Sequence, residues 1–247
     1  MEAILEVEAL TGGYARRDVL HDLTFSIHEA EIVGLIGLNG AGKSTTIKHI
    51  IGLLQERKGQ IKVKGRTIHE DMTYYRKQIA FVPEQPILYE ELTLYEHLRL
   101  TAMAYEIDEA IFQERLERLL KAFRMERYID WFPVHFSKGM RQKVMIMNAF
   151  LIEPSLYIVD EPFVGLDPLG IQAYLDWMQK MRDQGAGVLM STHILATAEK
   201  YCDRFIILHE GRIRAQGTIQ ELQKDFDMPG ASLDDIYIEL TKDDVHA

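Results

Sequence analysis

The sequence predicts an α/β fold with a mixed β core, a phosphate-binding loop and a helical lobe. Three observations lead to this prediction. A run of glycines ending in a lysine and a serine stands between an apolar stretch and a helical pattern. Residues 87–150 have mainly helical periodicity. Short apolar runs typical of buried parallel strands begin at Ile32, Ile79, Leu156, Val188 and Phe205.

The N-terminal part predicts antiparallel strands. Residues 4–10 and 19–27 alternate, or nearly alternate, between apolar and polar side chains, and Gly12-Gly13 separates them. Residues 60–64 predict one arm of a further hairpin. These strands make the β core mixed, because the later apolar runs predict a parallel sheet with helical crossovers.

The phosphate-binding loop is the most specific motif. Residues 37–44 fit the pattern Gly-x4-Gly-Lys-Ser, in which glycines let backbone N–H groups turn toward phosphate oxygens. In this pattern Lys43 reaches the β- and γ-phosphates, and the Ser44 hydroxyl binds Mg²⁺. An accidental glycine-rich turn is the alternative, which the flanking strand and helix oppose. The predicted nucleotide-binding residues are Gly37, Leu38, Asn39, Gly40, Ala41, Gly42, Lys43, Ser44 and Thr45.

A helical lobe over about residues 87–150 follows the strand at 79–82. Thr93 and Glu96 form a capping box for its first helix. Residues 110–123 predict a second helix with one face that we expect in the core. The residues of that face are Ile111, Phe112, Arg115, Leu116, Leu119, Leu120 and Phe123.

The last helix of the lobe begins at a second candidate phosphate site. Residues 136–143 read Phe-Ser-Lys-Gly-Met-Arg-Gln-Lys, and Ser137 is an N-cap candidate. A helix start with a serine and a glycine can bind phosphate. It lacks a nearby catalytic carboxylate, so it is not a complete active site. The alternative is an ordinary capped helix.

Acidic residues end the apolar run that begins at Leu156. Asp160 and Glu161 stand at the carboxyl end of this strand, where ligands of parallel sheets bind. We expect Asp160 to hold Mg²⁺, directly or through water. We expect Glu161 to orient, or accept a proton from, the water that attacks the γ-phosphate. The alternative is a strand that ends in solvated acids.

The C-terminal part predicts further elements of the same domain. The apolar run at 188–192 ends at His193, and a closing strand is predicted at 212–216. Thr218 and Glu221 form another capping box, and an amphipathic helix at 233–240 is expected to dock on the domain. We predict a single domain over residues 1–247 with a helical tail at about 218–247.

These motifs resemble those of the ATP-binding-cassette (ABC) ATPases, a branch of the P-loop NTPases, in the same order over about residues 3–222. The segment at 136–143 is similar to the family signature Leu-Ser-Gly-Gly-Gln and keeps Ser137 and Gly139. The resemblance assigns nucleotide-binding roles to both, and also to Asp167 in a segment similar to the family D-loop. Other residues follow the family pattern: His193 resembles the switch histidine that contacts the γ-phosphate, and Tyr14 occupies the place of the aromatic that stacks on adenine.

Two departures from the family pattern affect these assignments. The family usually places a glutamine directly after the proline that ends the second core strand, where it contacts Mg²⁺ and the attacking water. Here Pro83 is followed by Glu84, and Gln85 comes one residue later. The resemblance therefore implies a nucleotide and metal role for Glu84, with Gln85 as the alternative. Ala30 replaces a family glycine before the P-loop strand, and we expect no consequence.

The resemblance implies an ATPase subunit of a bacterial ABC transporter, of exporter type and similar to the Ecs branch. Two such subunits sandwich ATP, each molecule between Lys43 and Ser44 of one chain and Ser137 and Gly139 of the other. A chain with one cassette needs a second copy, most simply of itself, in an ATP-dependent homodimer. A separate transmembrane permease subunit would hold it in the cytoplasm, on the inner face of the membrane. The alternative is a soluble ABC ATPase for cofactor assembly or another non-transport role.

Composition excludes other classes of function. The net charge of −10 over 247 residues argues against binding to nucleic acid. The single cysteine excludes an internal disulfide. No apolar run approaches the ~18–20 residues needed to span a bilayer. If the chain drives transport, the membrane pathway therefore lies on another chain.

Overall fold

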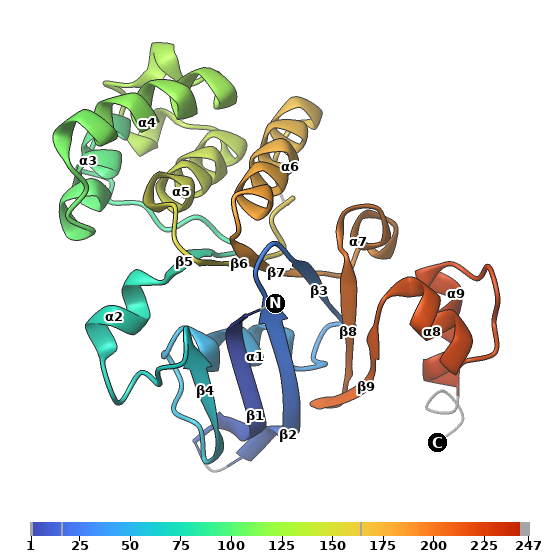
Figure 1. Cartoon of the computed structure of the whole chain (residues 1–247). Helices are drawn as coiled ribbons and strands as arrows, with labels where there is room; N and C mark the ends of the chain where they lie inside the picture. Colours follow the sequence, from blue (N-terminus) through green and yellow to red (C-terminus); the bar gives the residue numbers. More distant parts are fainter. Residues whose placement is uncertain (1, 16, 164, 243–247) are drawn as a thin grey trace.

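A six-stranded sheet forms the centre of the molecule in a computed structural model that describes residues 2–15, 17–163 and 165–242 (Figure 1). The first five strands in spatial order run parallel, and the sixth is an antiparallel edge. The order is β5 (Ile79–Val82), β6 (Leu156–Asp160), β7 (Gly187–Thr192), β3 (Ile32–Ile36), β8 (Arg204–His209) and β9 (Arg212–Gly217). Every residue of β3, β6 and β7 is buried, as the apolar runs predict for strands covered on both faces.

A three-stranded antiparallel sheet covers one side of the core. It consists of β2 (Arg17–His28), β1 (Ala3–Tyr14) and β4 (Lys58–Val63), and it encloses a hydrophobic cluster together with α1 (Lys43–Ile50). α2 (Met72–Lys77) contributes Tyr75 to the same cluster. The antiparallel prediction is confirmed.

The prediction that Gly12-Gly13 separates the first two strands is wrong. Both glycines lie inside β1 and do not separate the two strands. A Cβ added at Gly12 would lie 2.5 Å from Cε1 of His49 on α1. The glycine is therefore needed for the close approach of β1 to α1, and this approach gives no signal in the local sequence.

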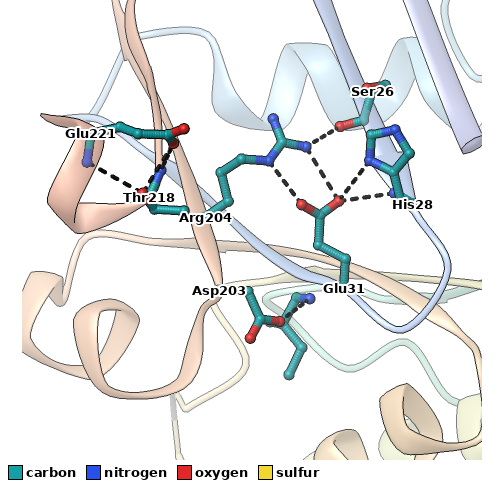
Figure 2. Close-up of polar contacts among 8 residues, drawn as sticks. Ser26, His28, Glu31, Asp203, Arg204, Thr218 and Glu221 are labelled. Atoms are coloured by element: carbon teal, nitrogen blue, oxygen red, sulfur yellow. Dashed lines mark hydrogen bonds and ion pairs between the residues drawn. The ribbon is translucent and has the colours of Figure 1, made fainter. Parts of the chain in front are cut away.

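A polar network fixes the antiparallel sheet to the core (Figure 2). Arg204, the first residue of β8, donates from Nε to Oε1 of Glu31 over 2.8 Å and from Nη2 to the Ser26 carbonyl over 2.6 Å. The other Glu31 oxygen accepts the His28 backbone N–H over 2.9 Å. Asp203 accepts the Ile32 backbone N–H over 2.8 Å. The link between β2 and β3 is thus tied to the start of β8.

Ala30 lies within this link and adopts a left-handed backbone with φ of 55°. This conformation is unfavourable for a residue with a Cβ, by roughly 1 kcal/mol, and glycine adopts it freely. The expectation that Ala30 has no consequence is therefore wrong. Ala30 carries a cost in backbone strain that a glycine would not.

The helical lobe packs on the opposite face of the core sheet from the antiparallel sheet (Figure 1). It contains α3 (Leu94–Ala104), α4 (Glu109–Phe123), two short 3-10 helices (Glu126–Tyr128 and Pro133–His135) and α5 (Lys138–Ile152). α6 (Pro168–Asp183) packs beside α5. The predicted capping box at Thr93 and Glu96 is confirmed.

The predicted buried face of α4 is confirmed at five positions and wrong at one. Phe112, Leu116, Leu119, Leu120 and Phe123 are buried. Ile111 is exposed, because it lies one residue outside the stripe that these five residues form. Arg115, next to that stripe, donates instead to the carbonyls of Leu151 and Ile152 at the end of α5.

Three helices cover one face of β3 and β8. They are α7 (Leu195–Tyr201), α8 (Ile219–Asp225) and α9 (Leu233–Thr241), and they share a hydrophobic cluster with Ile36 and Ile207. The capping box at Thr218 and Glu221 and the docking of the last helix are confirmed. Residues 243–247 of the predicted tail lie outside the described residues. Within the described ranges, no helix has the length and apolar character needed to cross a membrane.

Candidate nucleotide site

A cleft of about 340 Å³ opens at the carboxyl ends of β3, β6 and β7. Residues from five separate segments meet there, four of them at or after the carboxyl ends of parallel strands, as the rule for parallel sheets predicts. The cleft is lined by Val19, Leu38, Asn39, Gly40, Gly42, Lys43, Ser44, Thr45, Glu84, Asp160, Glu161 and His193. Most of the predicted nucleotide, metal and catalytic residues therefore lie together.

The loop between β3 and α1 has the shape of a phosphate cradle. Gly42 has φ of 112°, and a Cβ there would lie 2.8 Å from Leu20, so that position requires glycine. α1 begins at Lys43 directly after it. The first turn of a helix presents N–H groups without intrahelical partners, together with the positive end of the helix dipole. The loop therefore suits an anionic ligand.

Lys43 is the buried cation of the cleft. The residue is only 6% exposed, and Nζ donates to the Gly37 carbonyl over 2.7 Å and to the Leu38 carbonyl over 3.3 Å. Burial lowers the pKa of Lys43, while the nearby carboxylates of Glu161, Asp160 and Glu84 act in the opposite direction. The site thus contains one cation close to three carboxylates, a suitable setting for a phosphate with a divalent cation.

Asp160 is held by the neighbouring strand. It lies opposite Ser191 in the β6–β7 pairing, and Ser191 Oγ donates to Asp160 Oδ1 over 2.6 Å. This bond is buried and fixes the orientation of the carboxylate. The other oxygen, Oδ2, is the one that remains to bind a cation.

Glu161 and His193 are directly paired. His193 Nδ1 lies 2.9 Å from Glu161 Oε2; the histidine side chain is 55% exposed and the glutamate 12%. Glu161 has φ of 48°, an unfavourable conformation that is typical of functional sites. Its backbone N–H donates to the Ser191 carbonyl over 3.1 Å, which stabilises the turn. The strand end is therefore built to present Glu161 to the cleft.

The two candidates for the glutamine position differ in where they lie. Glu84 lines the cleft, whereas Gln85 is not among the lining residues.

Tyr14, the predicted adenine-stacking residue, lies at the end of β1 and is 44% exposed. Its hydroxyl accepts a hydrogen bond from Lys48 Nζ of α1 over 3.0 Å. This hydrogen bond is the main cause of a lowered pKa of Tyr14. The tyrosine ring thus lies beside the helix that follows the loop.

The predicted signature and D-loop residues are not among the residues that line this cleft. Ser137 caps α5 by accepting the Met140 N–H over 3.3 Å. A Cβ at Gly139 would lie 2.5 Å from the Gly165 carbonyl, so this glycine allows a close approach within the chain. Asp167 caps α6 by accepting the Gly170 N–H over 2.8 Å and lies 3.6 Å from Lys143 Nζ.

Comparison with known proteins identifies the family. Residues 20–164 match the sequence model of the family described as ABC transporter. The chain belongs to the ABC transporter family. It is 61% identical to the ABC-type transporter ATP-binding protein EcsA of Bacillus subtilis, over 98% of each chain. Placement in the Ecs-like branch is therefore confirmed.

Solved structures agree with this ABC assignment. A structure described as the ATP-binding subunit of an ABC transporter is 58% identical and has a TM-score of 0.94, over 96% of this chain and 99% of that one. CbiO1 of Clostridium perfringens, part of the ABC transporter complex CbiONQ, is 26% identical with a TM-score of 0.78, over 92% and 93%. The chain is an ATP-binding, ATP-hydrolysing ABC subunit that powers transport with a membrane partner.

Two residues of this ABC site were missed in the sequence. Val19 lines the cleft from β2, and strand alternation alone does not distinguish such a residue from core. Ser191 holds Asp160. A signal for Ser191 was available, because a polar side chain stands near the end of an apolar strand that runs parallel to the acidic one.

Proposed function

We propose that the cleft binds MgATP and that Glu161 and His193 act together in its hydrolysis. The observation that supports this most directly is the 2.9 Å contact between His193 Nδ1 and Glu161 Oε2 in the same cleft as Lys43. Lys43 would bind the β- and γ-phosphates, the loop amides would surround them, and Tyr14 would stack on adenine.

The residues present fit a magnesium ion. The Ser44 hydroxyl and the carboxylates of Asp160 and Glu84 are the oxygen ligands that hard cations prefer, and all three line the cleft. Mg²⁺ would neutralise phosphate charge when bound. Ser191 leaves Oδ2 of Asp160 available for this purpose, and Glu84 fits the metal role better than Gln85 because it reaches the cleft.

Glu161 would orient the attacking water or take its proton. A proton acceptor must stand within hydrogen-bond reach of that water, and the left-handed turn brings this carboxylate into the cleft. His193 contacts Glu161 from the end of β7 and would keep it in place while reaching the γ-phosphate. Exposure of the histidine side chain leaves it accessible to the ligand.

The site would be completed by a second copy of the chain. The exposed helix start at Ser137 and the nearby Gly139 and Asp167 lie outside this chain's own cleft. Such a helix start binds phosphate but lacks a catalytic carboxylate. Two copies related by a two-fold axis would each supply this surface to the nucleotide of the other.

The membrane partner would dock in an apolar groove of about 500 Å³. Its walls come from both the core and the helical lobe, and apolar residues dominate it, including Ile51, Leu53, Ile79, Phe81, Tyr105 and Met145. Leu53 is 67% exposed and continues this apolar lining, and a contiguous apolar surface of this kind is typical of a site for a protein partner. A segment seated there would sense movement of the lobe relative to the core. This contact would hold the chain at the inner face of the membrane.

Mixing two inactive variants tests the shared site. Lys43→Ala removes the phosphate-binding cation, and Ser137→Arg blocks the helix start. Each variant alone should be inactive, and a mixture should regain part of the phosphate release, because a mixed dimer contains one site with both halves intact. The control is each variant alone at the total protein concentration of the mixture. Absence of recovery, with mixed dimers shown by cross-linking, would count against a site shared between chains.

A further inference from the structure

The hydroxyl of Tyr237, in the last helix, contacts the phosphate-binding loop. The backbone N–H of Leu38 donates to this hydroxyl over 3.0 Å, although 199 residues separate the two. Leu38 is among the residues that line the nucleotide cleft. The C-terminal helix α9 therefore reaches the nucleotide site directly.

This contact acts on the peptide unit that holds Lys43. The N–H of Leu38 and the carbonyl of Gly37 belong to one planar peptide group. The carbonyl accepts Lys43 Nζ over 2.7 Å, and the N–H donates to Tyr237. Because the group is rigid, a rotation that breaks one of these bonds also displaces the other. Hydrogen bonds on the two sides of a peptide also polarise each other.

Packing keeps the phenol in place. Tyr237 is 7% exposed, and Leu233 and Ile236 of the same helix are completely buried. The Leu233 N–H donates to Glu199 of α7 over 2.8 Å. The helix is therefore fixed on two sides of the phenol, against the core at Ile36 and against α7.

The phenol also remains neutral. Burial raises the pKa of Tyr237, and the N–H of Leu38 acts in the opposite direction with a smaller effect. The hydroxyl thus keeps its proton at neutral pH while its oxygen accepts the amide N–H. It carries no charge that would repel a phosphate.

We propose that Tyr237 is a positioning residue of the ATP site. It fixes the Gly37–Leu38 peptide and, through the Gly37 carbonyl, the place from which Lys43 reaches the phosphates. The C-terminal helix α9 then contributes a positioning side chain to the nucleotide site. This inference rests on the role proposed above for Lys43.

Tyr237→Phe tests the proposal, because it keeps the ring and removes the oxygen. We expect the Kd for ATP to rise about three- to tenfold, the value of one hydrogen bond. The KM for ATP should rise in parallel, and kcat should change less, since Asp160, Glu161 and His193 are untouched. Exchange of the Leu38 amide hydrogen should accelerate in the variant.

Tyr75→Phe is the matched control. It removes another buried phenol, whose hydroxyl donates to the Ile50 carbonyl over 2.7 Å at the far end of α1. It should lower the melting temperature to a similar extent and leave both the ATP affinity and the Leu38 exchange unchanged. A purely structural role for Tyr237 would make the two variants behave alike.

Three results would overturn the proposal: an unchanged ATP Kd in Tyr237→Phe, an equal loss of affinity in Tyr75→Phe, or rapid exchange of the Leu38 amide in the unmodified protein. The exchange measurement needs no variant, so it applies even if Tyr237→Phe folds poorly. Lys43→Ala is measured in parallel. If it binds ATP normally, the proposed role of Lys43 fails; if it is impaired while Tyr237→Phe is not, only the role of Tyr237 fails.

Discussion

Glu161 combines backbone strain with a directed side-chain contact. Its φ of 48° places the carboxylate off the line of β6, and His193 Nδ1 lies 2.9 Å from it. A left-handed glutamate costs roughly 1 kcal/mol or more, so the surrounding structure must hold it. The bond from its N–H to the Ser191 carbonyl is one such restraint. We infer that the strain orients the side chain for hydrolysis.

Glu161→Gln should retain ATP binding and lose hydrolysis. Glutamine has the same shape but does not accept a proton, so the rate should fall roughly 10²–10⁴-fold. Equilibrium ATP titration and phosphate release measure the two effects separately. Glu210→Gln is a matched control, because Glu210 also has a left-handed backbone, with φ of 47°, but does not line the cleft. Normal hydrolysis in Glu161→Gln would exclude this carboxylate as a catalytic group.

Glu84 and Gln85 differ in whether they line the nucleotide cleft. Only Glu84 lines the cleft, and it lies close enough to Lys43 to influence its pKa. We therefore expect Glu84→Ala to raise the Mg²⁺ concentration needed for half-maximal ATPase activity, and Gln85→Ala to leave it nearly unchanged. Mg²⁺ titrations of the two variants decide this. A larger defect in Gln85→Ala would transfer the metal role to the amide.

The link between β2 and β3 shows how neighbouring elements are held together. Arg204 of β8 binds Glu31 and the Ser26 carbonyl, and His28 adds its backbone N–H (Figure 2). Burial tends to raise the pKa of Glu31, but the hydrogen bonds from Arg204 and His28 outweigh it, and the pKa is lowered overall. The ionised carboxylate thus stabilises the joint between the antiparallel sheet and the core.

This lowered pKa predicts an acid-sensitive contribution to stability. The contribution is fully present above the ordinary value of 4.5 and is lost as the pH falls through the lower pKa of the folded state. Glu31→Gln should reduce the free energy of unfolding by about 1–3 kcal/mol at neutral pH. The difference from the unmodified protein should shrink below pH 4.5.

Urea unfolding across a pH series measures this effect. Glu29→Gln is a suitable control, because Glu29 lies on the same link and its ion pair with Lys64 is more exposed. Exposed ion pairs contribute little, so this variant should change stability by under about 1 kcal/mol. A difference for Glu31→Gln that stays constant with pH would exclude the ionised pair as its cause.

On the scale of the whole molecule, the proposed shared site would be divided between two separate parts of the surface. The cleft contains the cation and the carboxylates, and the start of α5 lies outside it. Ser137 of the same chain is not among the residues that line this cleft. This arrangement favours a dimer in which the halves are exchanged.

ATP should drive dimerisation of Glu161→Gln. With hydrolysis blocked, closed dimers should accumulate, and light scattering after gel filtration should show a mass that doubles when MgATP is added. Adding Ser137→Arg to the same chain should prevent the increase, because the helix start would no longer fit the second nucleotide. A mass that stays monomeric with bound ATP would contradict the dimer proposal for the isolated subunit.

Local sequence patterns determined much of this protein. The apolar runs fixed the core strands, and the capping boxes at Thr93 and Thr218 fixed two helix starts, because both depend on near neighbours. The order of motifs from Tyr14 to His193 indicated the family. Lys43, Asp160, Glu161 and His193 were all placed correctly near one another, since the ends of parallel strands meet at one edge of a sheet.

Only the tertiary structure decided which distant groups touch. Gly12 of β1 leaves room for the ring of His49 on α1, which a Cβ at position 12 would approach to 2.5 Å. Ser191 of β7 donates a hydrogen bond to Asp160 of β6. Tyr237 reaches Leu38 from the far end of the chain, although its own sequence pattern indicates only a buried helix face. Such contacts depend on how elements pack in three dimensions, and periodicity reports only whether a side chain faces the core.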